Sequence, residues 1–327
     1  MRAPAFWSRN GLLAHALAPF TPITAAITAR RVARPGWRAP VPVICCGNAT
    51  VGGAGKTTLV LDLAQRLKQR GEQVHILLRG YGGVSYGATR VQPDDAAVKV
   101  GDEALLLREL APTWVSGDRA ASARAAVADG ATILLMDDGL QNPTLEKTCS
   151  LLVVDGATGF GNNRLLPAGP LREPVSAAAA RCQAAILIGP DRRNAATRLP
   201  PGLPIVRAEL QQDDGVRDLV GQRVVAFAGI AFPSKFFTAL RLAGAEVVGT
   251  RSFPDHYAYV PSELAELAAL ARQQGAILVT TPKDAVRLPP AFRSACTVIG
   301  VSLVWHDPRQ IDAILDKVIA TARVRVP

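Results

Sequence analysis

The sequence has no acidic residue before Asp62, and aromatic residues make up only 5% of the chain. The low aromatic content argues against a surface on which nucleic-acid bases stack, so we expect no nucleic-acid partner. Zinc-ligand spacing, a nucleophile elbow and a dinucleotide fingerprint are also missing. The five cysteines, an odd number without metal-ligand spacing, favour a reducing compartment over a disulfide-linked scaffold. These absences exclude several common classes of enzyme and secreted protein.

The positive charge is concentrated at one end of the sequence. The 327-residue chain has a net charge of +10, and seven basic residues precede the first acidic one. This asymmetry indicates an anionic partner near the N-terminus, either nucleic acid or a membrane surface, and the low aromatic content favours the membrane. With 49% hydrophobic and 20% charged residues, the chain has the composition of a globular protein, and its length predicts two domains.

Residues 11–29 form an uncharged stretch flanked by arginines. Two prolines and three threonines make it a poor membrane span, which needs about 20 strongly apolar residues. Leu13, Leu17 and Phe20 follow the spacing of one helix face, which predicts an amphipathic helix lying in an anionic headgroup layer. We reject a signal peptide, because the glycine-rich loop at residues 47–58 follows almost at once, and a phosphate-binding loop of this kind works with ATP in the cytosol. A helix packed on its own domain is the alternative interpretation.

Short apolar runs alternate with helical patterns along the remaining chain. We predict strands at 41–46, 73–78, 132–136, 151–155, 184–188, 223–228, 245–249 and 277–281, and helices at 56–70, 117–129, 234–243, 261–274 and 308–322. This alternation is typical of parallel sheets covered on both faces. Pro- and Gly-rich stretches at 161–174 and 189–204 separate two such blocks. We therefore predict an N-terminal segment at 1–38, a first domain at 39–205 and a smaller α/β domain at 206–327.

A glycine-rich loop joins the strand at 41–46 to the helix that follows it. Its context of strand, loop and helix is that of a P-loop, whose backbone N–H groups surround phosphate oxygens. Lys56 would reach the β- and γ-phosphates of ATP, and the Thr57 hydroxyl would hold Mg²⁺. Thr50 stands where the usual first glycine would be. The predicted nucleotide-binding residues are Thr50, Val51, Gly52, Gly53, Ala54, Gly55, Lys56 and Thr57.

Two carboxylates follow the strand at 132–136. Asp137 and Asp138 would lie at the carboxyl edge of the sheet, beside the phosphate loop. An aspartate in this place commonly anchors the P-loop magnesium, directly or through water. We predict that at least one of the two binds the metal together with Thr57, whereas the alternative for this short sequence is a simple turn.

Further polar clusters have both a functional and a structural interpretation. Asp102 and Glu103 open a helix, where an acid serves either as a cap or as a general base. Arg79 begins a glycine-rich loop and could contact phosphate. The polar, proline-rich stretch 161–174 predicts an ordered loop whose guanidinium groups bind an anionic ligand. His256 lies beside Asp255 in a predicted loop, where it is either structural or an acid–base residue.

Together these motifs resemble the tetraacyldisaccharide 4′-kinase family, the lipid A 4′-kinases of Gram-negative bacteria. The matching stretches are GNATVGGAGKT, RGYGG, GDE, DDGLQ, GFGNNRLLPAGPLREP, FPDHYAY and TTPKDAVRL, in family order from residue 47 to residue 287. The sequence departs from the family pattern at Thr58, Leu78, Ala104, Leu140 and Asn142, which concerns fine substrate contacts.

The resemblance implies a fold, a reaction and a place in the cell. The expected fold is a P-loop NTPase-like α/β/α domain with a second, smaller α/β domain and an N-terminal amphipathic membrane-associated helix. The expected reaction transfers the γ-phosphate of MgATP to the 4′-hydroxyl of tetraacyldisaccharide 1-phosphate. The substrate is a lipid, so we expect a peripheral protein on the cytoplasmic face of the inner membrane, and a monomer.

The resemblance also implies residue roles. Asp102 would be the base that activates the 4′-hydroxyl, working with His256 from the second domain, and Lys56 would act on the phosphates. The residues expected near the substrate or its phosphate are Arg79, Tyr81, Glu103, Arg172 and Glu173. Two alternatives are a membrane-associated partitioning-type P-loop ATPase and a kinase of another small-molecule acceptor.

Overall fold

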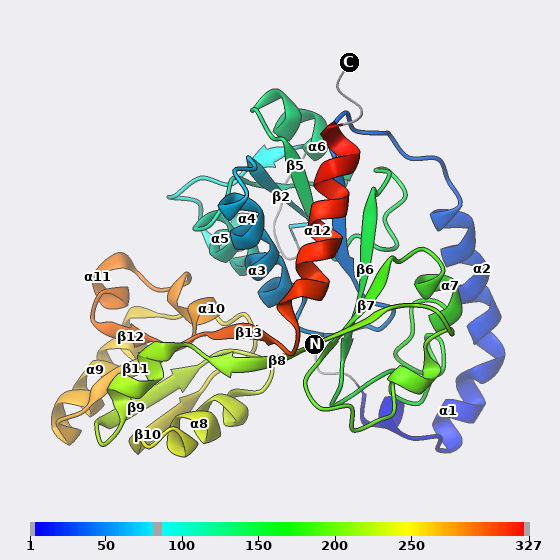
Figure 1. Cartoon of the computed structure of the whole chain (residues 1–327). Coiled ribbons are helices and arrows are strands. Elements are labelled where there is room, and N and C mark those ends of the chain that lie inside the picture. Colours follow the sequence, from blue (N-terminus) through cyan, green and yellow to red (C-terminus); the bar gives the residue numbers. More distant parts are fainter. Residues whose placement is uncertain (1–3, 81–86, 324–327) are drawn as a thin grey trace.

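The computed structural model describes residues 4–80 and 87–323, which form two lobes (Figure 1). The large lobe is built on a nine-stranded sheet. From one edge to the other its strands are β13 (Val301–Trp305), β8 (Ile205–Gln212), β7 (Ala184–Ile188), β6 (Cys149–Asp155), β1 (Val43–Gly47), β5 (Ile133–Asp137), β2 (Val74–Leu78), β4 (Thr113–Val115) and β3 (Thr89–Arg90). Only the outermost pairs, β13 with β8 and β3 with β4, are antiparallel.

Helices cover both faces of this sheet, because its central strands are apolar on both sides and are buried along their whole length. One core contains Leu59, Leu63 and Leu67 of α3 together with residues of α12. The other core packs small residues of α6 and α7 against the opposite face. The large-lobe helices are α3 (Lys56–Gln69), α4 (Ala97–Val100), α5 (Asp102–Arg108), α6 (Arg119–Ala128), α7 (Val175–Ala179) and α12 (Pro308–Arg323).

The small lobe has a parallel four-stranded sheet in the order β10-β9-β11-β12. Its two cores use only residues between Val216 and Ile299. Its strands are β9 (Arg223–Ala228), β10 (Glu246–Ser252), β11 (Ile277–Thr280) and β12 (Cys296–Val298). Its helices are α8 (Pro233–Leu242), α9 (Pro261–Gln274), α10 (Pro282–Ala285) and α11 (Pro290–Arg293). The predicted fold class, an α/β P-loop lobe with a smaller α/β lobe, is confirmed.

The sheets divide the chain differently from the predicted ranges 39–205 and 206–327. Strands β8 and β13 pair with each other and extend the large sheet, so the chain returns to the large lobe after the small one. Helix α12 then buries Ile311 and Leu315 in the core that contains α3. The Pro- and Gly-rich stretch 189–204 is therefore a connection between the neighbouring parallel strands β7 and β8, and the small lobe occupies about 213–300.

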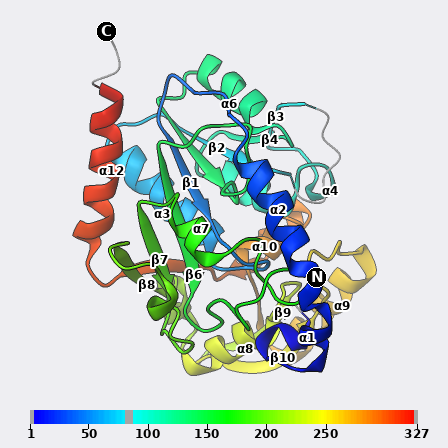
Figure 2. The same cartoon turned by 90° about the vertical axis from the view of Figure 1, so that its right-hand side faces the viewer.

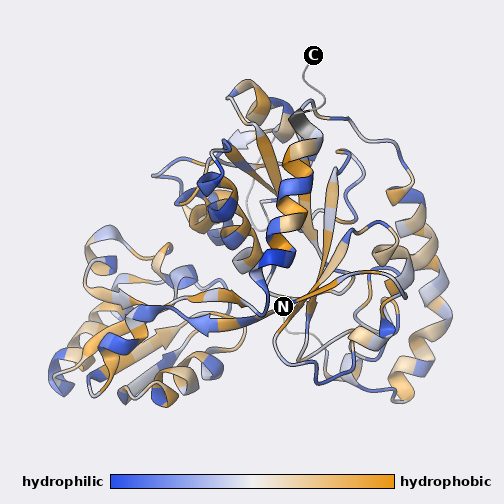
Figure 3. Cartoon of the chain, viewed as in Figure 1, coloured by the Kyte–Doolittle hydropathy of each residue, from blue (hydrophilic) through white to orange (hydrophobic). Residues whose placement is uncertain are grey.

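The N-terminal segment lies along the surface of the large lobe (Figure 2). It comprises a 3₁₀ turn (Ala5–Ser8), α1 (Leu12–Leu17), a second 3₁₀ turn (Ala18–Phe20) and α2 (Thr21–Val32), with the residues that join them. By length and composition alone, Leu12–Val32 could cross a membrane. Only 6% of its most apolar 18-residue stretch is buried against the rest of the protein, so most of this apolar surface is uncovered. The threonines of α2 are partly buried. Several large apolar residues of the segment are more than half exposed, namely Leu12, Leu13, Phe20, Ile23 and Ile27. Figure 3 colours much of the ribbon of α1 and α2 as hydrophobic.

Candidate active site

The phosphate loop follows β1, the middle strand of the large sheet. Gly52 and Gly55 have φ values of 120° and 79°, which glycine adopts without strain, and α3 begins immediately after the loop at Lys56. The N-terminus of α3 therefore presents free backbone N–H groups at the loop, which favours an anion. The Lys56 Nζ lies 3.5 Å from the carbonyl oxygen of Gly52 and 3.6 Å from Asp138 Oδ1. The eight predicted nucleotide-binding residues form one continuous loop and helix start.

Asp137 lies beside this loop because β5 pairs in parallel with β1, with Cys46 opposite Asp137. Its side chain is buried, and its Oδ1 has no hydrogen-bond partner among the described residues. Burial, and then the negative charge of Glu103, raise the pKa of Asp137 to about 7. A buried carboxylate without a partner is costly unless a cation compensates it, so this position fits a divalent metal ion.

Asp138 has a different environment from its neighbour. Its carboxylate accepts hydrogen bonds of 2.9 to 3.1 Å from both terminal nitrogens of Arg172. Burial favours the neutral acid, but the charges of Lys56 and Arg172 outweigh it and lower the pKa of Asp138. The φ of 49° at Asp138 is uncommon outside glycine, and such residues cluster at functional sites. The structure thus brings Lys56, Asp138 and Arg172 together beside the phosphate loop.

Asp102 and His256 meet at the junction of the two lobes. His256 Nδ1 lies 2.9 Å from Asp102 Oδ2, although the two residues are 154 positions apart in the sequence. Asp102 is buried at the start of α5, whereas the His256 side chain is 52% exposed and has a φ of 59°. The hydrogen bond to Asp102 raises the pKa of His256 despite the opposing effect of burial. Burial opposes ionisation of Asp102, but His256, Lys283 and Arg287 together lower its pKa.

Glu103 links this pair to the phosphate loop. Its Oε1 accepts a hydrogen bond of 3.2 Å from the Thr57 hydroxyl and one of 2.7 Å from Lys283 Nζ. Lys283 belongs to α10 of the small lobe, and Arg287 of the same lobe lies 3.9 Å from Asp102. No pattern in the sequence predicted a role for Lys283 or Arg287, although both lie in the family-like stretch TTPKDAVRL. Two neighbouring carboxylates of α5 therefore contact three basic side chains of the small lobe.

The remaining predicted residues differ in their positions. Glu173 is buried and accepts hydrogen bonds from Arg181 and Gln141, so it holds the Gln141 side chain in place. Gln141 in turn accepts a hydrogen bond from Arg172. Arg79 directly follows β2, and its side chain is exposed. Tyr81 lies outside the described residues.

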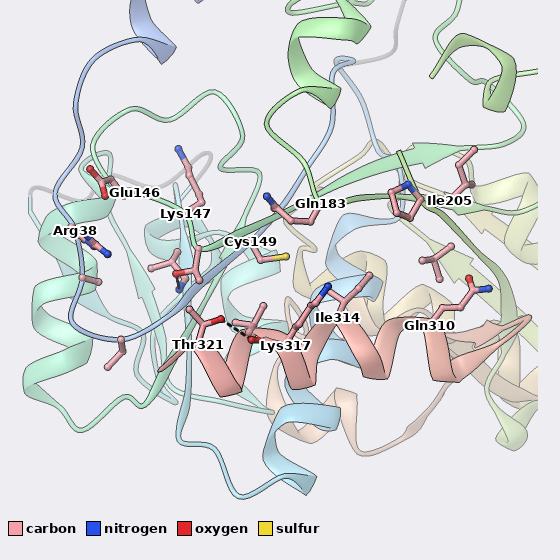
Figure 4. A pocket seen from close by; sticks show the side chains of 17 residues that line it. Arg38, Glu146, Lys147, Cys149, Gln183, Ile205, Gln310, Ile314, Lys317 and Thr321 are labelled. Atoms are coloured by element: carbon pink, nitrogen blue, oxygen red, sulfur yellow. Dashed lines mark hydrogen bonds between the residues drawn. The ribbon is translucent and has the colours of Figure 1, made fainter. Parts of the chain in front are cut away.

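A separate cavity of about 830 Å³ opens at the amino-terminal ends of the strands of the large sheet, opposite the end that carries the phosphate loop. It lies between α12 and the beginnings of β1, β6 and β8, and Arg38 and Lys317 are among its lining residues (Figure 4). The phosphate loop follows the carboxyl end of β1, so this cavity is not part of the site described above.

A phosphate loop at a helix N-terminus, an acidic residue on the adjacent strand and an acid–histidine pair from two lobes define a P-loop phosphotransferase. The comparisons with known proteins identify the family. A model of the family described as "Tetraacyldisaccharide-1-P 4'-kinase" matches residues 13–320. The chain therefore belongs to the tetraacyldisaccharide-1-phosphate 4′-kinase family, as the sequence motifs predicted.

Individual relatives agree with this assignment over almost their whole length. A tetraacyldisaccharide 4′-kinase from Gluconacetobacter diazotrophicus is 54% identical over 97% of this chain and 98% of its own. One from Rhodospirillum rubrum is 48% identical over 98% of both chains. A crystal structure from Aquifex aeolicus, described as the "apo" form in complex with ATP, has a TM-score of 0.76 and 26% identity. It covers 94% of this chain and 100% of that one. The fold and the family are thus shown independently.

Proposed function

We propose that this protein transfers the γ-phosphate of MgATP to the 4′-hydroxyl of tetraacyldisaccharide 1-phosphate, giving the 1,4′-bisphosphate of lipid A biosynthesis. The observation that carries this proposal is one continuous set of contacts. It runs from His256 through Asp102 to its neighbour Glu103 and from there to the Thr57 hydroxyl. An acid–base pair and a phosphate loop in direct succession suit the transfer of a phosphoryl group to an alcohol.

Each residue has a definite part in the proposed reaction. Lys56 and the N-terminus of α3 hold the β- and γ-phosphates, and Arg172 lies at the same loop. Asp102 accepts the proton of the 4′-hydroxyl as the new P–O bond forms and ADP departs. His256 fixes the orientation of the Asp102 carboxylate through the 2.9 Å contact. The low pKa of Asp102 keeps it ionised, and therefore able to accept a proton, at neutral pH.

A magnesium ion fits the site described above. Thr57 and Asp137 would hold it together with the nucleotide phosphates, because Mg²⁺ usually takes one or two protein oxygens and keeps phosphate and water ligands. Asp138 is already paired with Arg172 and Lys56, so we propose that it contacts the ion through a water molecule and not directly. When bound, the ion would neutralise charge that develops on the phosphate oxygens.

The lipid substrate gives the N-terminal segment a purpose. The exposed apolar residues of α1 and α2, with the arginines that follow them, suit an anionic membrane surface. Since the second substrate is ATP, we place the protein on the cytoplasmic face of the inner membrane. We also propose that it works as a monomer, because the acid–base pair and the phosphate loop that the proposed reaction needs already contact each other through Glu103 within one chain.

A phosphorylation assay tests the proposed function. Purified protein, MgATP and tetraacyldisaccharide 1-phosphate should yield the 1,4′-bisphosphate, and Lys56→Ala should abolish most of this activity without unfolding the protein. ATP hydrolysis that needs no acceptor would favour the partitioning-type ATPase. Phosphorylation of a deacylated, water-soluble disaccharide at the same rate would favour a kinase of small soluble acceptors.

A further inference from the structure

Residues 159–172, here called the docking loop, bind the N-terminal segment instead of exposing their polar groups to a ligand. Asn162 lies at the centre of the loop and is buried. Its backbone N–H donates to the carbonyl of Trp7 at 2.7 Å, and its side-chain amide lies 3.3 Å from the carbonyl of Arg9. The Trp7 indole N–H donates in return to the carbonyl of Pro167 at 3.2 Å.

The guanidinium group of Arg164 also faces the N-terminal segment. Its Nε donates to Asn10 at 2.9 Å, and a terminal nitrogen lies 3.1 Å from His15 of α1. The polar, proline-rich sequence of this stretch predicted that its arginines bind an anionic ligand. The structure instead places Arg164 against the segment that carries the exposed apolar residues.

The other end of the docking loop forms part of the active site. It runs antiparallel to the phosphate loop, where the Val51 N–H donates to Pro170 at 2.8 Å and the Arg172 N–H donates to Ala49 at 2.7 Å. The carbonyl of Arg172 accepts a hydrogen bond of 3.1 Å from the hydroxyl of Thr28 in α2. Arg172 therefore contacts the phosphate loop and α2 through its backbone, and Asp138 through its side chain.

Close packing makes the docking loop a single stiff unit. A Cβ atom at Gly169 would lie 2.2 Å from the side-chain oxygen of Asn162 and 2.4 Å from the carbonyl oxygen of Arg164. A Cβ atom at Gly161 would lie 2.7 Å from the carbonyl oxygen of Trp7. Because a packed unit of this kind moves as a whole, displacement of the N-terminal segment should also displace Arg172.

We propose that the docking loop couples the N-terminal segment to the active site, with Thr28 as a positioning residue for Arg172. When α1 and α2 settle on a membrane, the loop holds Arg172 and the phosphate loop in their working positions, so that the membrane raises turnover as well as the local concentration of lipid. This inference rests on the proposed function for its kinetic readout. Its structural readout needs no turnover.

Three variants of the full chain test the coupling by kinetics. Thr28→Val removes the hydroxyl that donates to Arg172, whereas Thr28→Ser keeps a donor. Thr24→Val is the matched control, because Thr24 is also a partly buried threonine of α2 but its hydroxyl has no hydrogen-bond partner within the described part of the chain. With acceptor lipid in vesicles of phosphatidylethanolamine and phosphatidylglycerol, Thr28→Val should lower kcat about fivefold, the effect of losing one hydrogen bond. KM for the lipid and vesicle binding should stay within about twofold, since the exposed apolar face is intact.

The comparison between variants decides the kinetic outcome. Thr28→Ser and Thr24→Val should both keep a kcat near that of the wild type. If Thr28→Val has the same kcat as Thr24→Val, the coupling is refuted. A loss of vesicle binding in Thr28→Val that accounts for its whole loss of activity would also overturn the proposal, because Thr28 would then serve only to seat the helix.

Amide hydrogen exchange provides the second readout. Adding the same vesicles, without substrates, should slow amide exchange in the docking loop (residues 159–172) of the wild-type protein but not of Thr28→Val. Protection confined to the N-terminal segment would contradict the coupling. If the wild type shows the expected protection but does not phosphorylate the lipid, the proposed function fails while the coupling itself stands.

Discussion

Asp102 and His256 form the contact on which the proposed chemistry depends, and a double-mutant cycle tests it. If the two act as one unit, Asp102→Ala and His256→Ala should each lower kcat by roughly 10²–10⁴. The double variant should then lose much less than the product of the two losses. ATP affinity should change little in all three variants, because neither residue belongs to the phosphate loop.

The helix-cap alternative for Asp102 predicts a different result. In the structure Gly101 is the N-cap residue, and among the described residues Asp102 Oδ1 accepts a hydrogen bond only from the N–H of the adjacent Glu103, at 3.0 Å. If this local bond were the whole role of Asp102, its replacement would cost about 1 kcal/mol of stability and leave kcat nearly unchanged. Measuring kcat, ATP Kd and Tm for the whole cycle separates the two roles, and multiplicative rate losses would refute the pairing.

Asp137 and Asp138 are adjacent, yet their substitutions should have opposite effects on the metal-free protein. The folded-state pKa of Asp137 is about 7, above the ordinary value of about 3.9. Its ionised form therefore costs stability, and this cost disappears as pH falls through 7 toward 4. At pH 8 without metal, Asp137→Asn should be at least as stable as the wild type. Asp138→Asn should be less stable, because Arg172 and Lys56 lose their shared partner.

With magnesium bound, the wild type should become more stable than Asp137→Asn. The wild-type Tm at pH 8 should be higher with ADP and Mg²⁺ than with ADP and a chelator, because the ion compensates the buried carboxylate. Asp137→Asn should lose most of this difference. An equal magnesium-dependent rise in Tm for Asp137→Asn and the wild type would exclude Asp137 as a ligand.

At the scale of single elements, α2 exposes its most apolar residues and turns its threonines toward the protein. A helix that served only to cover the large lobe would have the opposite orientation. Replacing Ile23 and Ile27 together by serine should weaken binding to anionic vesicles about tenfold, because both side chains would enter the apolar part of the interface. The fold should be unaffected, since both residues are exposed.

Leu242→Ser is the matched control for this experiment. Leu242 is an equally large and even more exposed apolar residue, but it lies at the end of α8 in the small lobe. Its replacement should leave vesicle binding unchanged. If Leu242→Ser lost as much vesicle binding in a sedimentation assay as the variant with Ile23 and Ile27 replaced, exposed apolar area in general, and not α2, would bind the membrane.

The strands show how far secondary structure can be predicted from this sequence. The eight predicted strands all occur, because each is a short, continuous apolar run that can be recognised locally. Strands β3, β4, β8, β12 and β13 were not predicted, and β3 has only two residues. β8 and β13 have many exposed residues and mixed polarity, since they pair at an edge of the sheet, and β4 and β12 have only three residues each. Edge position and shortness remove the apolar signal.

At the scale of the whole molecule, the sequence predicted the residues of the site better than the contacts between them. The phosphate loop was predictable because strand, glycine loop and helix are neighbours in sequence. The contact between Lys283 and Glu103 spans 180 positions, and the bond from Thr28 to Arg172 spans 144. Pairs of this kind follow from the return of the chain through the small lobe and from the seating of α2, which no local pattern specifies.

That return of the chain predicts which fragments fold. Residues 213–300 contain a complete four-stranded sheet with their own two cores, so this fragment should unfold cooperatively when heated. A fragment ending at residue 205 lacks β8, β13 and α12. It would expose the face of α3 on which Ile311 and Leu315 pack, and would leave Arg66 and Arg70 without Asp312. It should therefore aggregate or stay partly unfolded. Circular dichroism melting and amide NMR dispersion of both fragments provide the measurement, and cooperative folding of 1–205 alone would show that the large lobe does not need the returning chain.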